Sequence, residues 1–292
     1  MNRNEEPAVL RIGLPKGRMQ DGVLALLAEA GIHVSFDSRG YRPRLSLSGF
    51  DAKMLKPQNI VEMLSAGSRD LGFAGADWVA ELRADVVEVL DTGLDPVRLV
   101  AAAPLRLLEN GKLPAGRHLV VASEYENIAR KWIADTGLDA RFVRSYGATE
   151  VFPPEDADCI VDNTSTGSTL RANGLEIVAD LMRSTTRLYA HPGALEDPAR
   201  RALIEDLVLL ARSVLEARTR VVVELNVPRD RLDAVVAILP SMREPTVSPL
   251  HGDAGYAVKV AVSRADLPRL IPRIKAAGGC DIVVTTPSQI VA

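Results

Sequence analysis

Short apolar runs alternate along this chain with stretches of helical spacing. Apolar runs over 8–14 and 118–122 have the length of buried strands, and each leads into an amphipathic stretch, over 20–30 and 124–135, that a glycine closes. Apolar strands that alternate with helices are typical of helices packed on a largely parallel sheet. The pattern therefore predicts an α/β fold.

The same pattern extends through the first 217 residues. Further strands are predicted over 44–48, 70–74, 86–90, 97–103, 141–145, 159–161 and 185–190, and further helices over 60–66, 78–82 and 197–217. Composition changes at Pro104, so we place a lobe boundary there and expect the chain to return to the first lobe at 185. The predicted division is 1–103 with 185–217 for the first lobe and 104–184 for the second. One lobe interrupted by another leaves a cleft, where ligands usually bind.

From residue 220 the order of elements changes. Strands are predicted over 221–227, 246–250, 256–262 and 281–285, and helices over 229–239 and 265–277. This β-α-β-β-α-β order is ferredoxin-like. A small module with polar helix faces is more often a regulator or an oligomer contact than a chemical site. We therefore predict a separate domain over 218–292.

The stretch with the clearest chemical character follows the predicted strand 159–161. That strand ends on Asp162 and leads into a small hydroxylated turn, after which 170–175 could open a helix. The turn contains Ser165, Thr166, Gly167, Ser168 and Thr169. Free backbone N–H groups, hydroxyls and a helix dipole would hold a phosphate there, and Asp162 could accept hydrogen bonds from sugar hydroxyls. A phosphorylated sugar fits both parts, although the turn alone also fits an ordinary Ser/Thr helix cap.

Two other turns carry candidate residues with an alternative explanation. Lys16 and Arg18 follow the first strand and could clamp phosphates, or they form a solvated pair at a helix entrance. Gly75 would let a ligand approach the backbone, or it lets a helix pack closely on the sheet. Asp77 reads most simply as a helix N-cap.

Composition and charge narrow the class of protein. The chain has 292 residues, of which 47% are hydrophobic and only 4% aromatic, which suits helices on parallel sheets better than a β-sandwich. A net charge of −3 provides no general attraction to nucleic acid or to an anionic membrane, so we expect neither as a partner. Anionic substrates would need locally placed Lys and Arg.

Cysteine and histidine usage points to a reducing compartment without a dedicated metal site. Cys159 and Cys280 lie in apolar runs far apart, which favours buried reduced thiols and a cytoplasmic location. No export signal or apolar run of about 18 residues is present. The four histidines share no ligand spacing, and the chain contains neither Gly-x-Ser-x-Gly nor a Walker loop.

Six stretches give a resemblance to a known family, and one of them is the strand with its Gly-x-Asp turn over 70–77. Residues 162–175 resemble the phosphoribosyl diphosphate loop of ATP phosphoribosyltransferases, and 14–18 resemble the family's Leu-Pro-Lys-Gly-Arg motif. Residues 38–41, which include Arg39, are similar to an Arg-bearing stretch of the long form. Residues 244–250 and 278–284 resemble its C-terminal regulatory domain. The resemblance spans nearly the whole chain.

The resemblance implies both a fold and a reaction. The expected fold is α/β, with a two-lobed periplasmic-binding-protein-like catalytic core and a C-terminal ferredoxin-like regulatory domain. The expected reaction joins N1 of ATP's adenine to C1 of phosphoribosyl diphosphate and releases pyrophosphate, which is the first step of histidine biosynthesis. Mg²⁺ is the implied cofactor, histidine the implied inhibitor, and a homo-oligomer, dimer to hexamer, the implied assembly.

The resemblance also assigns residues to roles. Ser165, Thr166, Gly167, Ser168 and Thr169 would bind the 5-phosphate, Asp162 and Glu150 the ribose side, and Lys16, Arg18, Arg39, Gly75 and Asp77 ATP or pyrophosphate. Mg²⁺ would be carried by pyrophosphate with few protein ligands. Thr246 would contact histidine, and Asn226 stands where some relatives place an acid for the ligand's amino group.

One segment departs from the family, and two other function classes fit parts of the pattern. Residues 152–158 lack the small Gly-Leu-Ala run usual before the acidic strand, so the approach to the cleft is expected to differ. A two-lobed protein that binds a small anion without chemistry would need export, for which no signal is present. A catalytically silent regulatory paralogue would not need the intact loop and Lys-Gly-Arg motif.

Overall fold

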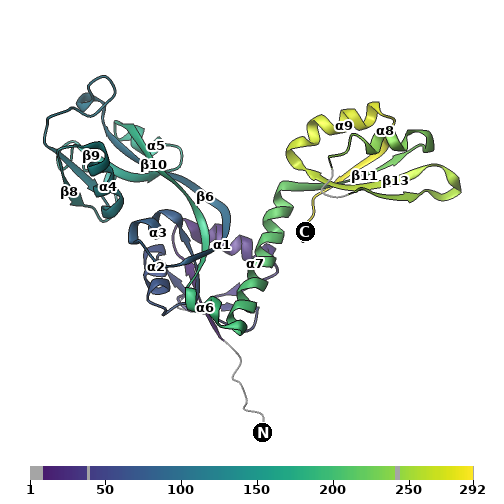
Figure 1. The fold of residues 1–292 in the computed structure, drawn as a ribbon, viewed down its shortest axis with the longest axis horizontal. Helices are drawn as coiled ribbons and strands as arrows, with labels where there is room; N and C mark the ends of the chain where they lie inside the picture. Colours follow the sequence, from purple (N-terminus) through teal and green to yellow (C-terminus); the bar gives the residue numbers. More distant parts are fainter. Residues whose placement is uncertain (1–8, 38–39, 241–243, 292) are drawn as a thin grey trace, which may run out of the picture. The chain divides into compact units, whose positions relative to one another are not determined.

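The computed structural model describes residues 9–37, 40–240 and 244–291 (Figure 1). The chain divides into two compact units, one up to residue 28 with 32–206, and one of 29–31 with the chain from 207 onward. The division falls inside the long helix α7 (Pro198–Thr219). Among the described residues, no helix is long and apolar enough to cross a membrane.

The first unit is built on one eight-stranded sheet. The strand order is β4-β1-β5-β10-β6-β9-β7-β8. The bounds are β1 (Leu10–Pro15), β4 (Phe50–Leu55), β5 (Leu71–Gly75), β6 (Val87–Pro104), β7 (Leu119–Ser123), β8 (Ala140–Arg144), β9 (Cys159–Thr164) and β10 (Leu175–Ala190), with β2 (Val34–Ser35) and β3 (Arg44–Leu45) as a separate pair. Strands β4, β1 and β5 are mutually parallel, as are β9, β7 and β8, so each end of the sheet has its own parallel group.

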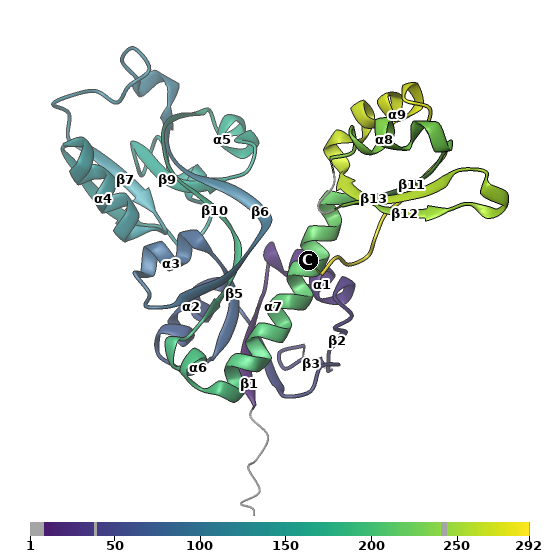
Figure 2. The same ribbon diagram turned by 45° about the vertical axis from the view of Figure 1, so that its right-hand side comes forward.

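Strands β6 and β10 join the two groups. They run antiparallel to each other over most of their length, and Figure 2 shows both passing from the lobe with α2 (Pro57–Ser65) to the lobe with α4 (Glu126–Thr136). One lobe is thus interrupted by the other and two connections link them. The two-lobed α/β core expected from the sequence is confirmed.

The prediction of two strands over 86–90 and 97–103 is wrong, because β6 is a single strand of 18 residues. Its turn-like residues are absorbed without ending the pairing: Gly93 and Asp95 adopt left-handed φ values of 65° and 49°. The register with β10 shifts on both sides of Thr186, opposite this region. Such β-bulges accommodate extra residues in a continuous ladder.

Helices cover both lobes. Besides α2, α4 and α7 they are α1 (Met19–Glu29), α3 (Ala76–Leu82), α5 (Ser168–Ala172) and α6 (Pro192–Glu196), with one-turn 3₁₀ helices at Leu105–Leu107 and Thr149–Val151. Helix α2 buries Ile60, Val61 and Leu64 against the sheet. A Cβ on Gly72 would lie 2.4 Å from Ile60 Cγ2, so this glycine permits the close approach of α2 to β5.

The second unit has the ferredoxin-like order that the sequence predicts. Its elements are β11 (Arg220–Val227), α8 (Leu232–Val236), β12 (Thr246–Pro249), β13 (Tyr256–Ser263), α9 (Leu267–Ala276) and β14 (Cys280–Thr285), with 3₁₀ turns at Arg229–Arg231, His251–Asp253 and Arg264–Asp266. The sheet order is β12-β13-β11-β14, with every neighbouring pair antiparallel. The predicted helix 229–239 is shorter than expected, since its first turn is 3₁₀.

The core of this second unit lies on one face of its sheet. Alternate β11 residues such as Val223 and Leu225 are buried together with Leu270 and Ile274 of α9. Figure 2 shows α8 and α9 on the same side of the strands. The residues between, including Glu224 and Asn226, are only partly buried and belong to the opposite face, away from α8 and α9.

Candidate active site

The hydroxylated loop lies between β9 and α5 and is held by its own side chains. Thr164 Oγ1 accepts a hydrogen bond from the Gly167 N–H at 2.9 Å, and Thr166 Oγ1 accepts one from the Ser168 N–H at 3.3 Å. Arg171 Nη2 donates to the Thr166 carbonyl at 3.0 Å. Gly167 has a φ of 74°, which a β-branched residue rarely adopts. The loop conformation is therefore fixed before any ligand binds.

The helix after this loop differs from the prediction. A helix was expected over 170–175, but α5 begins at Ser168 and has only 5 residues, and β10 begins at Leu175. Asn173 and Gly174 end the turn by bonding to carbonyls of α5. A helix this short contributes little dipole, so the loop's hydroxyl and N–H groups remain as its donors for an anion.

A cavity of about 260 Å³ opens over this loop. Glu150 and Asp162 line it together with Ser165, Thr166, Ser168 and Thr169. Glu150 comes from the 3₁₀ helix Thr149–Val151, and Asp162 from the carboxyl-terminal half of β9. The structure thus brings two carboxylates and a run of hydroxyl groups to one cavity.

The electrostatics of this cavity are governed by Asp162. Burial raises the pKa of Asp162 to about 6, with Glu150 and Glu124 adding to the increase. The Asn163 N–H, which donates to Asp162 Oδ1 at 2.7 Å, acts in the opposite direction. Acidic groups gathered in this way favour a cationic species between them.

The basic turn after β1 does not reach that cavity. Gly17 has a φ of 79°, Arg18 is exposed, and Lys16 Nζ lies 3.6 Å from the centroid of the Tyr41 ring. Neither Lys16 nor Arg18 lines the cavity of the loop. Arg39 lies outside the described residues.

Asp77 is not a helix N-cap. Gly75 is the residue at that position, and Asp77 is 1% exposed within the first turn of α3. Its Oδ2 accepts a hydrogen bond from the Tyr125 hydroxyl at 2.7 Å, and its Oδ1 one from the Ser184 hydroxyl at 2.8 Å. Both carboxylate oxygens are thereby occupied, which argues against the expected contact with ATP or pyrophosphate.

Gly75 has a packing explanation. A Cβ at this position would lie 2.1 Å from Asp77 Oδ1 and 3.0 Å from Met19 Cε. The glycine makes room for the buried carboxylate. The structure thus favours the close-packing alternative over ligand approach.

Tyr125 links the two lobes. Its hydroxyl donates to Asp77 of the first lobe and accepts from Asn163 Nδ2 of the second at 2.9 Å. Its ring stacks on Trp78 with centroids 4.6 Å apart, and burial raises its pKa. Asn163 is the neighbour of Asp162, so the cavity is tied to helix α3 of the other lobe through one buried hydroxyl.

Glu81 of α3 makes a second contact of the same kind. It is 3% exposed, and its carboxylate accepts hydrogen bonds from the Asn127 and Ile128 N–H groups at 3.0 and 3.1 Å. These are orphan N–H groups of the first turn of α4, which otherwise has no side-chain cap. Helix α3 therefore holds the start of α4 with two buried acids.

A second cavity, of about 410 Å³, lies between the lobes. Lys56 and Trp78 line it from the first lobe, and Glu124, Arg144 and Tyr146 from the second. Tyr146 is 87% exposed. Sequence reasoning missed these residues, although Lys56, Glu124 and Tyr146 each follow a strand end within two residues. Lys56 follows β4, an edge strand that the sequence analysis did not predict. In this strand the charged residues Asp51 and Lys53 interrupt the apolar run.

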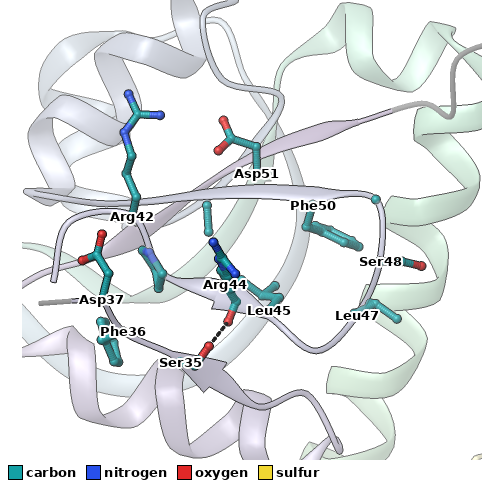
Figure 3. A pocket seen from close by; sticks show the side chains of 13 residues that line it. Ser35, Phe36, Asp37, Arg42, Arg44, Leu45, Leu47, Ser48, Phe50 and Asp51 are labelled. Carbon is teal, nitrogen blue, oxygen red and sulfur yellow. Dashed lines mark hydrogen bonds between the residues drawn. The ribbon is translucent and has the colours of Figure 1, made fainter.

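A third cavity, of about 820 Å³, is formed beside β3 and β4 (Figure 3). Arg42 and Arg44 line it, and Ser35 Oγ donates to the Arg44 carbonyl at 3.3 Å. None of the described residues that the sequence nominated lies along it. Ser35, Ser48, Asp37 and Asp51 also line it, so its lining mixes basic and acidic side chains, whereas both charged residues that line the loop cavity are acidic.

The divergent segment 152–158 is folded against the second lobe. Phe152 and Ala157 pack on the core of that lobe, and the Asp156 N–H donates to the Phe152 carbonyl at 2.8 Å. Asp158 Oδ2 accepts from the Val120 N–H at 2.9 Å. The segment is therefore anchored at both ends next to Glu150.

No metal cluster is evident in the described part of the chain, where three or more His, Cys, Asp or Glu side chains never converge. Cys159 and Cys280 are both free. The carboxylates of Asp162 and Glu150 line the loop cavity, and carboxylate oxygens are of the kind that Mg²⁺ prefers.

Comparison with known proteins identifies related chains. Residues 56–212 match the family model described as ATP phosphoribosyltransferase, and 217–287 match the model described as HisG, C-terminal domain. The ATP phosphoribosyltransferase of Chlorobium luteolum is 40% identical over 276 residues, covering 92% of this chain and 93% of its own. That of Pelotomaculum thermopropionicum is 37% identical over 281 residues, covering 94% and 96%.

A solved structure shares the fold of the core. It is the ATP phosphoribosyl transferase (HisG:HisZ) complex from Thermotoga maritima, with a TM-score of 0.61 and 24% sequence identity. The match covers 70% of this chain and 99% of that one.

The Tyr125 link predicts a measurable loss of stability. Tyr125→Phe removes the hydroxyl that bonds to buried Asp77, and leaving a buried acceptor with one partner fewer costs about 1–3 kcal/mol. The free energy of unfolding from urea denaturation should fall by that amount. Tyr146→Phe, at an exposed ring, is the control and should change it by less than about 0.5 kcal/mol. Equal stabilities of the two variants would contradict the link.

Proposed function

The chain belongs to the ATP phosphoribosyltransferase family, with the C-terminal domain of its long form, and from this premise we propose how its residues carry the reaction. The enzyme transfers the 5-phosphoribosyl group of phosphoribosyl diphosphate to N1 of ATP's adenine and releases pyrophosphate. This is the first step of histidine biosynthesis, and the C-terminal domain implies feedback regulation by histidine.

The chemistry needs few dedicated groups. The ring nitrogen of adenine already carries a free lone pair, so no general base has to activate it. The barrier lies in the departure of pyrophosphate and in the positive charge that develops on the ribose. Positioning of the two substrates and stabilisation of that charge should therefore dominate catalysis.

We assign the loop cavity to the phosphoribosyl group. In this proposal Ser165, Thr166, Gly167, Ser168 and Thr169 bind the 5-phosphate, while Asp162 and Glu150 face the ribose. The observation that carries the assignment is that these hydroxyl groups and both carboxylates line one cavity of about 260 Å³. A phosphate held on the hydroxyl side would bring the sugar's developing charge toward the acids.

The cleft between the lobes is proposed for ATP. Lys56, Arg144 and Tyr146 line it and offer two cations and an exposed ring against which a purine could stack. Lys16 and Arg18 remain candidates for phosphate binding from the neighbouring turn, as does Arg39. Gly75 and Asp77 are proposed to position the lobes rather than to touch a substrate.

Mg²⁺ is proposed to enter with the substrate. Asp162 and Glu150 fit such an ion as its protein-side oxygen donors, and the remaining ligands would come from phosphate oxygens and water. A bound Mg²⁺ would supply charge neutralisation to the pyrophosphate leaving group. The protein's own contribution is to orient the phosphoribosyl group through the loop.

Regulation and assembly are assigned to the second unit. We propose that histidine binds there, on residues that include Thr246 and Asn226, and that the chain forms a homo-oligomer, dimer to hexamer. The proposed division places catalysis in 1–217, with 104–184 as the second lobe, and regulation in 218–292. The ferredoxin-like unit contains none of the residues assigned to the transfer reaction, which supports separate roles.

A direct assay tests the activity. The purified protein is mixed with ATP, phosphoribosyl diphosphate and Mg²⁺, and pyrophosphate and the nucleotide adduct are followed over time. Both products should appear in equal amounts. Binding of either substrate without product above background would instead favour a binding protein or a catalytically silent paralogue.

The loop assignment predicts a large loss from one hydroxyl. Thr169 lines the cavity and is exposed to it, so Thr169→Ala should lower kcat/KM for phosphoribosyl diphosphate by about 10²-fold if its hydroxyl meets the 5-phosphate in the transition state. Thr136→Ala, on the surface of α4, is the control and should leave kcat/KM unchanged. A fully active Thr169→Ala enzyme would show that the phosphate binds elsewhere.

The raised pKa of Asp162 predicts a pH dependence. If the carboxylate faces the developing cation, kcat/KM should fall about tenfold per pH unit below about 6, as Asp162 takes up a proton. The remaining activity of Asp162→Asn should not show the fall that protonation of Asp162 causes. Any acidic fall that remains in the variant would come from titration of the substrates' phosphates. An identical acidic limb in the variant would remove Asp162 from the mechanism.

The raised pKa of Asp162 also predicts how the free energy of unfolding depends on pH. Folding raises the pKa of Asp162 from about 3.9 to about 6, so burying its negative charge destabilises the folded state. This destabilisation is absent below about pH 3.9, where the group is protonated in both states, and complete above about pH 6. Asp162→Asn should therefore unfold at higher urea than the parent protein at pH 7.5. The difference should vanish near pH 4, which unfolding curves at both values would test.

A further inference from the structure

A pocket of about 490 Å³ lies on the face of the ferredoxin-like sheet opposite to α8 and α9. All four strands contribute to it, with Glu224 and Asn226 from β11, Thr246 from β12, Lys259 from β13 and Asp281 from β14. The volume is in the range of pockets that hold small metabolites. Sequence analysis assigned Asn226 and Thr246 to histidine binding but did not consider Asp281.

The two carboxylates that line this pocket, Glu224 and Asp281, have different partners. Lys259 Nζ pairs with Glu224 Oε1 at 2.6 Å, and the two residues are direct cross-strand partners. Asp281 has no ion pair among the described residues. Its Oδ2 accepts a hydrogen bond from the neutral Asn226 amide at 2.9 Å. Of the two carboxylates in the described lining of the pocket, Asp281 is thus the one without a salt bridge.

That carboxylate stays ionised. The hydrogen bond from Asn226, followed by one from Cys280, lowers the pKa of Asp281 below its usual range. Lys275 acts in the same direction from further away. Asn226 therefore orients the negative charge rather than supplying one.

The backbone around Asp281 is specialised. Glu224 pairs with Val283 and Asn226 pairs with Cys280, so Leu225 alone lies opposite two residues of β14, Asp281 and Ile282. This is a β-bulge, and Asp281 adopts a left-handed φ of 49° within it. Bulges redirect side chains and are over-represented next to functional sites. The unusual conformation places the Asp281 carboxylate against Asn226.

We propose that Asp281 is the residue that recognises the amino group of histidine in the regulatory pocket. The inference rests on the proposed inhibition by histidine and names the charge that the binding site uses. An α-ammonium group is a compact cation with three donors, and it suits an ionised carboxylate already oriented by an amide. The hydroxyls of Thr246 and Ser248 line the same pocket and remain for the other polar atoms of the ligand.

Asp281→Asn is the variant of choice for the test. Asparagine has nearly the same shape and tolerates a left-handed φ, so the bulge is preserved while the charge is removed. Isothermal titration of the full-length protein with L-histidine should show affinity weakened about tenfold or more, the loss expected for a hydrogen bond to a charged group. Urea denaturation confirms that the variant is folded.

A second ligand separates recognition from a structural effect. Imidazole-4-propionate is histidine without its amino group, so its binding should be little affected by Asp281→Asn. The parent protein should prefer histidine over this analogue, and the variant should lose that preference. Equal weakening of both ligands, or no weakening of either, would overturn the proposal.

Two further variants provide controls. Glu224→Gln removes a carboxylate that is already paired with Lys259, and histidine affinity should change less than about threefold, as for exposed ion pairs. The double variant Asn226→Asp/Asp281→Asn exchanges the two side chains, so the pair again carries one negative charge. It should recover most of the histidine affinity that Asp281→Asn loses. A loss from Glu224→Gln as large as that from Asp281→Asn would assign the charge to Glu224 instead.

The design distinguishes this inference from the function on which it rests. If the parent protein binds no histidine and is not inhibited by it, both the regulatory function and the role of Asp281 fail. If the parent protein is inhibited and Asp281→Asn is inhibited equally, only the role of Asp281 fails.

Discussion

The antiparallel pairing of β6 with β10 is the interaction on which the rest of the catalytic unit depends. Strand β9, which carries Asp162, adds to β6 on one side, and β5, which ends at Gly75, adds to β10 on the other. Both lobes are thus extensions of one strand pair. Several β-bulges around Ser184 and Thr186 shift the register of this pair without ending it. They allow the two strands to twist between the two groups of parallel strands.

Two buried acids of α3 add contacts between the lobes to the pairing of β6 with β10. A carboxylate removed from water is costly unless its oxygens are satisfied, so Asp77 and Glu81 strongly favour the arrangement in which Tyr125 and the start of α4 are in place. Asn163 extends this arrangement to the loop cavity. A position that a sequence reading treats as a helix cap is therefore a contact between the lobes.

The sequence predicted features that depend on local pattern. Strand and helix periodicity was sufficient for the ferredoxin-like order, and the run of small hydroxylated residues was sufficient to locate the loop of the cavity. It did not predict features set by distant partners. The burial of Asp77 depends on Ser184, more than a hundred residues later. The turn-like composition of 91–96 gave no sign of a strand, and this part of β6 pairs with β10, whose residues lie about ninety positions later in the chain. The contact between Asn226 and Asp281 likewise joins residues 55 positions apart.

The two proposed binding sites share one hydrogen-bonding arrangement, but one of them is largely buried and the other is exposed to solvent. In each, a carboxylate accepts a hydrogen bond from an uncharged N–H donor, the backbone of Asn163 for Asp162 and the amide of Asn226 for Asp281. Burial beside other acids raises the pKa of Asp162 to about 6, whereas the hydrogen bonds of solvent-exposed Asp281 lower its pKa. In the proposed reaction, the first carboxylate, Asp162, would gain most from a cation that forms only during the transfer, because that cation would offset the cost of burying the negative charge. The second carries a constant charge across physiological pH, which suits a sensor whose response should follow the concentration of its ligand and not the acidity of its surroundings.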